Sequence, residues 1–324
     1  MFGDAHSDLL LELVHRQRER DPFGRRWLPR LRAGDVGLQI CAIFAADEPS
    51  PAAARASARR QADAFAQAVR DHRNAVVEVR AAVDLDPADN RVALILAIEG
   101  ADALAAEDDA FEEAWERGVR VVGLTWNRAN AFAGGVETPE NGLTDAGAEL
   151  VERLIAAGGV VDLAHASART FDDVLSAVPP GRAFVSHAGC RAVYDHPRNL
   201  DDEQLRALAG HGGLFGVAAV GDILGEASRE RWLVHVEHAA SVAGIDHVCL
   251  GSDFIDQVAR SGALSGGWRR AAARARRHPA VVPGLAGPQD YPRAAELLRR
   301  AGLGDARLFG ENLRTFLAEA LPRD

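Results

Sequence analysis

The chain has 324 residues, 48% of them hydrophobic, and its 47 acidic residues against 37 basic ones give a formal net charge of −10. This acidic balance argues against nucleic acid or an anionic membrane surface as a partner. No apolar run approaches the ~18 residues of a membrane span, and we expect no signal peptide. The three cysteines lie far apart in apolar stretches, as is typical of buried thiols in a reducing compartment: Cys41, Cys190 and Cys249. We therefore expect a cytoplasmic protein.

All the basic residues are arginine, because the sequence contains no lysine. This excludes enzymes that form a Schiff base on lysine, including those that use pyridoxal phosphate. It also excludes a lysine carbamate as a bridge between metal ions. A bridging protein ligand would have to be aspartate or glutamate.

Short apolar runs alternate along the chain with amphipathic stretches. The runs are almost continuously apolar, as expected of strands buried on both faces of a parallel sheet. We expect strands at residues 2–6, 37–45, 92–98, 119–125, 159–163, 183–186, 213–217 and 248–251. We expect helices at residues 52–73, 106–117, 144–157, 170–177, 201–211 and 228–243, and two more between residue 290 and the region of residue 321.

Eight strands separated by helices predict a TIM-type (β/α)8 barrel, an α/β fold, with extra C-terminal helices and a single domain over residues 1–324. The alternative is an open doubly wound sheet, but no glycine fingerprint follows the first strand. Residues 255–288 fall outside the alternation, so we expect a long loop there. Its segment 268–278, WRRAAARARRH, is interpreted as a solvated helix face or lid in preference to a basic binding patch.

Potential metal ligands follow five of the eight expected strands. They are His6 and Asp8, Glu99, His165, His187, and Asp253. All strands of a parallel barrel end at the same mouth, where active sites of this fold lie, so we expect these six side chains to converge. His235 and His238 lie within an expected helix and are interpreted as helix-surface residues.

Three imidazoles and three carboxylates suit a pair of divalent ions, with Zn²⁺ the leading choice. Two such ions can share a carboxylate and a water that loses its proton near neutral pH. The sequence has no Gly-x-Ser-x-Gly elbow to supply a serine nucleophile. The residues therefore favour hydrolysis by a metal-bound hydroxide.

Eight segments follow one another in the order and spacing of a known family. They are DAHSDLL (4–10), AIEG (97–100), GVRVVGLTWN (118–127), GLTDAGAELVERLIAAGGVVDLAHAS (142–167), FVSHAGCRAVYDHPRNLDDEQLRAL (184–208), GIDHVCLGSDF (244–254), DYP (290–292) and GENLRTF (310–316). Along almost its full length the chain resembles the membrane dipeptidase (renal dipeptidase) family of the amidohydrolase superfamily. The resemblance also implies a homodimer.

The resemblance implies a role for each expected site residue. His6 and Asp8 would bind one ion, Glu99 would bridge both, and His165 and His187 would bind the second. Asp253 would be the general acid and base: it would take a proton from the water that bridges the two ions and deliver it to the leaving amine. Arg198 would pair with the free carboxylate of the substrate.

The chain departs from the family pattern after the fourth strand. Family dipeptidases usually carry a histidine there that polarises the scissile carbonyl, whereas this chain has Trp126 followed by Asn127. Loss of one such donor typically costs ~10²–10³ in rate unless another group replaces it. Asn127, Asn130 and the Trp126 indole are the open alternatives, and we expect Trp126 and Asn127 to line the substrate site.

Three functions remain open on this basis. The first is a zinc-dependent dipeptidase. Its small-molecule substrate would be a dipeptide with a free C-terminal carboxylate, and some substrates would carry a D-residue at this C-terminal end. The second is a related metallohydrolase acting on another small amide, such as an N-acyl amino acid or a cyclic amide. The third is a catalytically silent binding homologue, which the buried cluster of like charges disfavours.

Overall fold

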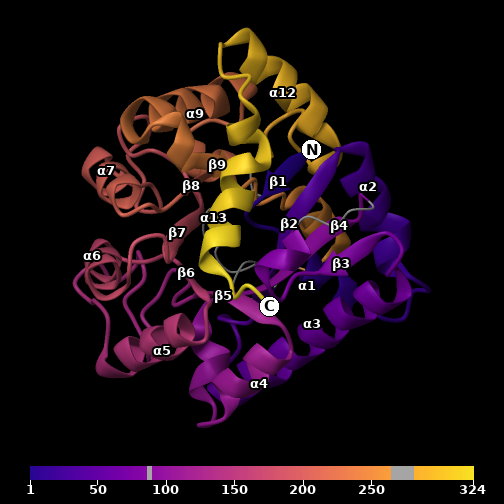
Figure 1. Ribbon diagram of the computed structural model, residues 1–324, viewed down its shortest axis with the longest axis vertical. Coiled ribbons are helices and arrows are strands. Elements are labelled where there is room, and N and C mark those ends of the chain that lie inside the picture. The colour runs from indigo at the N-terminus through magenta and orange to yellow at the C-terminus, as the bar shows by residue number, and fades with distance from the viewer. Residues whose placement is uncertain (86–89, 264–280) are drawn as a thin grey trace.

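The computed structural model describes residues 1–85, 90–263 and 281–324. Within them, nine parallel strands form one sheet (Figure 1). The strands are β1 (Phe2–Asp4), β2 (Val36–Phe44), β3 (Val76–Glu78), β4 (Val92–Glu99), β5 (Val119–Gly123), β6 (Val160–Asp162), β7 (Ala183–Ala188), β8 (Phe215–Val217) and β9 (Val248–Leu250). Eight of them close into a barrel, because β1 pairs with both β2 and β9 while β2 also pairs with β4. The predicted (β/α)8 barrel is confirmed.

The ninth strand, β3, is the one that the sequence pattern missed. It pairs with the first residues of β4, and β5 continues along the same edge of β4 from Leu96. A run of three residues, VVE, is too short to show a period. The strand therefore extends the barrel wall at its base without entering the ring.

Helices surround the barrel (Figure 1). Their bounds are α1 (Leu9–His15), α2 (Leu28–Ala33), α3 (Pro51–Asp71), α4 (Ala110–Glu116), α5 (Asp145–Ala156), α6 (Ala168–Ala177), α7 (Asp202–Gly210), α8 (Gly221–Leu224), α9 (Arg229–Ala243), α10 (Asp256–Ser261), α12 (Tyr291–Arg300) and α13 (Asn312–Ala320). Several begin where a side chain caps the helix: the hydroxyl of Thr144 accepts from the Gly147 amide, and Asp201 forms a capping box with Gln204.

The segment expected as a loop after the last barrel strand is only partly described. Its start forms helix α10, which the sequence did not predict. The arginine-rich segment 268–278 lies outside the described residues. The two expected C-terminal helices are present as α12 and α13.

Alternate residues of each strand enter two different parts of the core. On β4, Ile95 points into the barrel, whereas Leu96 packs outward against the helices. The inner cluster also contains Leu313, Phe316 and Leu317 of α13. The C-terminal helix therefore closes the barrel at the amino ends of its strands, which leaves the carboxyl ends as the mouth. The three cysteines are buried, as expected.

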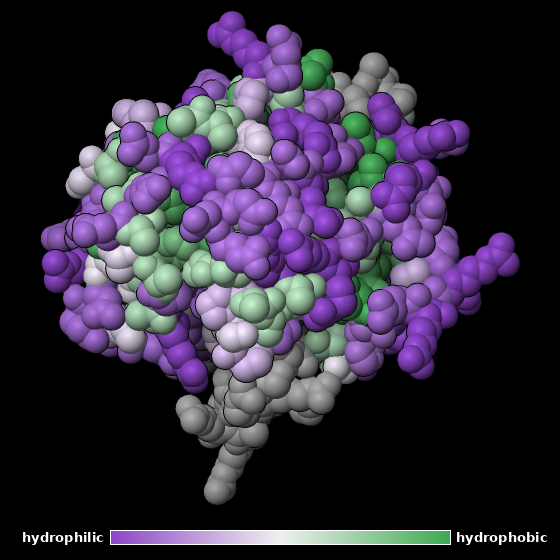
Figure 2. Space-filling view, turned by 90° about the horizontal axis from the view of Figure 1, so that it is seen from below, coloured by the Kyte–Doolittle hydropathy of each residue, from purple (hydrophilic) through white to green (hydrophobic). Residues whose placement is uncertain are grey.

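The molecular surface drawn in Figure 2 is mostly hydrophilic, with hydrophobic side chains in small separate areas. Among the described helices, none combines the length and the apolar character that a membrane crossing requires.

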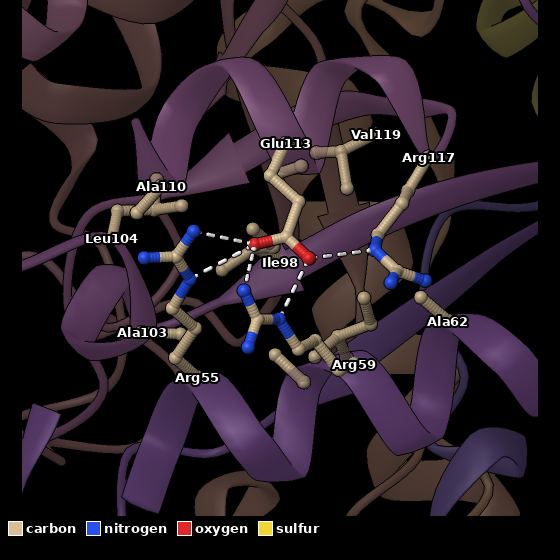
Figure 3. A pocket seen from close by; sticks show the side chains of 13 residues that line it. Arg55, Arg59, Ala62, Ile98, Ala103, Leu104, Ala110, Glu113, Arg117 and Val119 are labelled. Atoms are coloured by element: carbon tan, nitrogen blue, oxygen red, sulfur yellow. Dashed lines mark hydrogen bonds and ion pairs between the residues drawn. The ribbon is translucent and has the colours of Figure 1, made fainter. Parts of the chain in front are cut away.

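Helices α3 and α4 are joined by an ion-pair network over a small apolar cavity (Figure 3). The Glu113 carboxylate lies at its centre and accepts hydrogen bonds of 2.6–3.0 Å from Arg55, Arg59 and Arg117. The hydrogen bond from Arg59, together with those from Arg55 and Arg117, holds the pKa of Glu113 at about 2, although burial of the carboxyl raises it. The buried Arg55 also pairs with Glu107 and Asp109 at 2.7 Å, so its charge is shared with two carboxylates besides Glu113.

We expect Glu113→Gln to lower the melting temperature at pH 7 by about 2–4 °C, because one carboxylate serves three arginines. The folded pKa is depressed, so this contribution is complete above about pH 4.5 and is lost as pH falls toward 2. Thermal unfolding of both proteins between pH 7 and 3 measures it. The matched control is Glu112→Gln, which removes one exposed ion pair with Arg153. An equal loss in the two variants would contradict the prediction.

Candidate metal centre

The six expected ligand-type residues meet at the mouth of the barrel. His6 and Asp8 follow β1, Glu99 is the last residue of β4, and the rest are His165 after β6, His187 within β7 and Asp253 after β9. Asp8 directly precedes α1, yet within the described residues its side chain makes no capping hydrogen bond to the helix. Its carboxylate is grouped instead with His6 and Asp253, with ligand atoms within 4.8 Å of one another.

Glu99 stands between the histidines, and its two oxygens face different partners. Oε1 lies 2.9 Å from His165 Nε2 and 3.6 Å from His187 Nε2. Oε2 lies 3.7 Å from His6 Nε2. A carboxylate with this placement can bind one ion through each oxygen.

His6 also faces the other two carboxylates. Its Nε2 lies 3.9 Å from Asp8 Oδ1 and 4.0 Å from Asp253 Oδ1. Among the described residues, His6 Nε2 and Asp8 Oδ1 are buried and have no hydrogen-bond partner. Buried polar atoms are normally paired, and these two face each other across 3.9 Å, so both are available to bind an ion between them.

The electrostatics of the cluster favour a bound cation. Burial lowers the pKa of His6 to about 3 and those of His165 and His187 well below the usual value, which leaves bare nitrogen lone pairs at neutral pH. Burial, reinforced by the repulsion between carboxylates, raises the pKa of Asp8 and Glu99. A divalent ion compensates both effects, because it binds neutral imidazole and balances the carboxylate charge.

Two of the six residues have backbone angles that are unusual for side-chain-bearing residues. His165 has φ of 66° and Asp253 has φ of 49°, both in the left-handed region. Such conformations cost roughly 1–3 kcal/mol and persist where surrounding contacts impose them. Here they turn the chain sharply at the strand ends.

Polar neighbours orient the two histidines next to Glu99. Asn127 Oδ1 lies 2.7 Å from His165 Nδ1, and Ser186 Oγ lies 2.8 Å from His187 Nδ1. These contacts leave Nε2 of each ring directed at Glu99. Asn127 was expected to line the substrate site, and the structure places its oxygen on a histidine. The contact of Ser186 with His187 was not predicted, although a serine directly before an expected ligand histidine is a signal that the sequence contains.

The remaining expected residues flank the cluster. Arg198 is buried, donates through Nη2 to the His187 carbonyl at 3.1 Å, and has its pKa lowered to about 10 by burial. Trp126 packs edge-on against Phe44 with ring centroids 5.3 Å apart, and lies 5.9 Å from the His165 ring. Trp126 thus lies between Phe44, the last residue of β2, and the His165 ring.

One alternative to the family histidine is engaged elsewhere. Asn130 donates through Nδ2 to Asp102 and to the Leu124 carbonyl, while its oxygen accepts from the Phe132 and Ala133 amides. Its side chain therefore holds the loop after β5. Asn127 and Trp126 remain as candidate donors.

His235 corrects a sequence-based expectation. It was expected on the surface of a helix, but it is fully buried, with Nδ1 accepting from the Cys190 amide and Nε2 close to the Leu224 carbonyl. The surface prediction was wrong because α9 packs this face against the barrel. His238, three residues on, is only partly exposed and contacts Asp202 at 2.7 Å.

Comparison with known proteins identifies the family. The family model for membrane dipeptidase (peptidase family M19) matches residues 2–264. The chain belongs to the membrane dipeptidase family. It is 28% identical over 249 residues to an uncharacterized dipeptidase of Schizosaccharomyces pombe, a match that covers 70% of this chain and 60% of that protein. The chain spans between 43% and 66% of the length of the curated relatives it matches.

Solved structures of membrane dipeptidase relatives share the whole fold. A metallopeptidase of family M19, dipeptidase AC, superimposes with a TM-score of 0.83 at 26% identity, covering 98% of both chains. A metallopeptidase from Rhodobacter sphaeroides, liganded with a phosphinate mimic of the dipeptide L-Ala-D-Ala, gives 0.84 at 25% identity, covering 98% of this chain and 99% of that one.

With added Zn²⁺ as the probe of divalent-ion binding, we expect Asn127→Ala to lower the affinity of the cluster by roughly 10–100-fold, because His165 loses the partner that fixes its ring orientation. Competition with a chromophoric chelator measures the affinity of the metal-stripped protein. Arg128→Ala is the control, since this neighbouring side chain is exposed and its ion pair with Glu137 is long, at 3.4 Å. Equal affinities for the two variants would show that Asn127 does not support a metal ligand.

Proposed function

We propose that this member of the membrane dipeptidase family is a binuclear metal-dependent dipeptidase that hydrolyses the amide bond of dipeptides. The observation that carries the proposal is the convergence of three imidazoles and three carboxylates on the barrel mouth from strands scattered through the chain. Two ligand-type atoms of that cluster, His6 Nε2 and Asp8 Oδ1, are buried and have no hydrogen-bond partner within the described part of the chain, which supports metal binding.

His6 and Asp8 would hold one ion, His165 and His187 the second, and Glu99 both, with Zn²⁺ as the proposed metal. Two such ions supply a water activated at neutral pH and a Lewis acid for the carbonyl oxygen. The placement of the two Glu99 oxygens toward different histidines supports the bridging assignment.

Asp253 is the proposed proton carrier. Burial raises its pKa to about 6, so at neutral pH it is mostly a carboxylate that can accept a proton and release it again. Its Oδ1 lies 4.0 Å from His6 Nε2, at the rim of the cluster. From there it would take the proton of the attacking water and give it to the leaving amine nitrogen.

Arg198 is the proposed binding partner of the substrate carboxylate. One of its nitrogens is anchored on the His187 carbonyl, which holds the guanidinium beside the cluster and leaves other donors for a ligand. The relative from Rhodobacter sphaeroides binds a mimic of L-Ala-D-Ala, which supports acceptance of a D-residue at the carboxylate end here.

A second candidate is another small amide, such as an N-acyl amino acid. The observation that favours it is Trp126, which stands where the family usually has a histidine and packs edge-on against Phe44, 5.9 Å from the His165 ring. An indole at this place suits an apolar acyl group better than the charged amine of a dipeptide.

The deciding experiment is hydrolysis of an L–L and L–D dipeptide panel, with N-acetyl amino acids beside it, by zinc-loaded protein. We expect zinc-dependent cleavage of at least one dipeptide and none after chelation. Cleavage of the N-acyl compounds alone would favour the second candidate. No cleavage of any compound by protein that holds two ions would contradict both.

We expect Arg198→Lys to raise KM by about 10-fold or more for substrates with a free carboxylate, because a lysine cannot reproduce the planar two-point contact. For the same substrates with the carboxylate amidated, kcat/KM should change little. Steady-state kinetics on each acid and amide pair measure this. Equal losses on both members of a pair would mean that Arg198 supports the cluster and does not recognise the carboxylate.

A further inference from the structure

Two buried aspartates lie at the strand ends directly before the metal centre. Asp4 is the last residue of β1 and Asp162 the last residue of β6, and both side chains are enclosed. Each aspartate also has a register partner on the neighbouring strand. Asp4 pairs in register with Leu250 of β9, and Asp162 pairs with Phe184 of β7.

Each aspartate binds two backbone amides through one oxygen. Asp162 Oδ1 accepts from the amides of Ala164 and Ser186, both at 2.9 Å. In each case the donors lie two residues beyond the aspartate and two residues beyond its register partner.

The arrangement at Asp4 repeats this pattern. Asp4 Oδ1 accepts from the amide of His6 at 3.3 Å and from that of Ser252 at 3.0 Å. The same kind of side-chain contact thus joins β6 to β7 and, at another place in the barrel, β1 to β9. In both pairs it lies at the carboxyl ends of the strands.

These contacts occur where the backbone ladder stops. The register pairs of β6 with β7 end at Asp162, and the chain then turns through the left-handed residue His165. The single register pair of β1 with β9 is that of Asp4, and the left-handed Asp253 follows Ser252. A carboxylate thus provides an acceptor that the departing backbone does not.

The four amides all belong to the functional segments. His6 is itself an expected ligand, Ala164 precedes His165, Ser186 precedes His187, and Ser252 precedes Asp253. A shift of either strand end would therefore move a ligand or the proton carrier. Displacements of this kind near 1 Å are enough to impair a site.

We propose that Asp4 and Asp162 are positioning residues, each tying two neighbouring strand ends together so that the side chains beyond them meet at the spacing of a metal pair. This inference rests on the proposed function, because it takes His6, His165 and His187 as ligands.

The test compares Asp162→Ala with Asn312→Ala. Asn312 is a matched control, since it is also buried and its Nδ2 donates to two backbone carbonyls, those of Ile245 and Val248, at the opposite end of the barrel. Two readouts are used: zinc affinity by chelator competition, and amide hydrogen exchange by mass spectrometry in metal-free protein over residues 160–167 and 183–188.

We expect Asp162→Ala to lose roughly 10–100-fold in zinc affinity and to exchange faster in both segments, with Asn312→Ala close to wild type in both readouts. Asp162→Asn retains the acceptor oxygen and should restore the slow exchange and most of the affinity. The pair Asp4→Ala and Asp4→Asn repeats the comparison over residues 2–8 and 248–254, so the test does not depend on one variant that folds poorly.

Zinc affinity in Asp162→Ala and Asp4→Ala equal to that of Asn312→Ala would overturn the positioning role and leave the proposed function intact. Failure of the asparagine variants to recover either readout would also overturn it, because the role assigned is that of an acceptor. A wild-type chain that binds no divalent ion would instead refute the proposed function itself.

Discussion

Closure of a ring of parallel strands is the constraint on which the rest of the structure depends. Every strand delivers its carboxyl end to one mouth, so residues as distant in sequence as Asp4 and Ser252 come within 3.0 Å. The opposite end is closed by apolar side chains of α13. With one end sealed and the other lined by imidazoles and carboxylates, chemistry is confined to a single opening.

Several features at this mouth destabilise the folded state, and the rest of the fold must offset the free energy that they cost. Like-charged carboxylates lie near one another, imidazoles are kept neutral by burial, and two residues adopt left-handed backbone angles. Well-packed strands and outer helices, joined by networks such as that of Glu113, supply the stabilisation. Ions bound at the mouth would add their binding free energy to folding, since an unfolded chain cannot present the same ligands.

The sequence predicted the barrel and the grouping of ligand-type residues because both follow from simple patterns. Apolar strands recur at regular intervals, and polar side chains stand at their ends. The features that were missed leave little or no pattern in the sequence. Strand β3 has only three residues and is recognised by its pairing with β4, and His235 is buried because this face of α9 packs inward.

The buried aspartates illustrate the same limit. A carboxylate inside the run 160–163 signals that some partner must exist, but the sequence does not identify the amide of Ser186 as that partner. The position of Trp126, where the family resemblance leads one to expect a histidine, shows the limit from the other side: the residue was identified and its contacts were not. Trp126 was recognisable from the motif, whereas its contact with Phe44 required the register of β2 and β4.

The pairing of β1 with β9 has a consequence for the order in which the protein acquires its parts. Glu99, His165 and His187 lie on strands that are made one after another, so their half of the centre can form before the ring is complete. The group of His6, Asp8 and Asp253 exists only once the two ends of the sheet have met across nearly the whole chain. Such long-range contacts form late, because loop closure over that length is entropically costly. Asp253, the proposed proton carrier, belongs to the group that depends on this long-range contact, so a chain whose ring has not closed does not yet hold it beside His6 and Asp8.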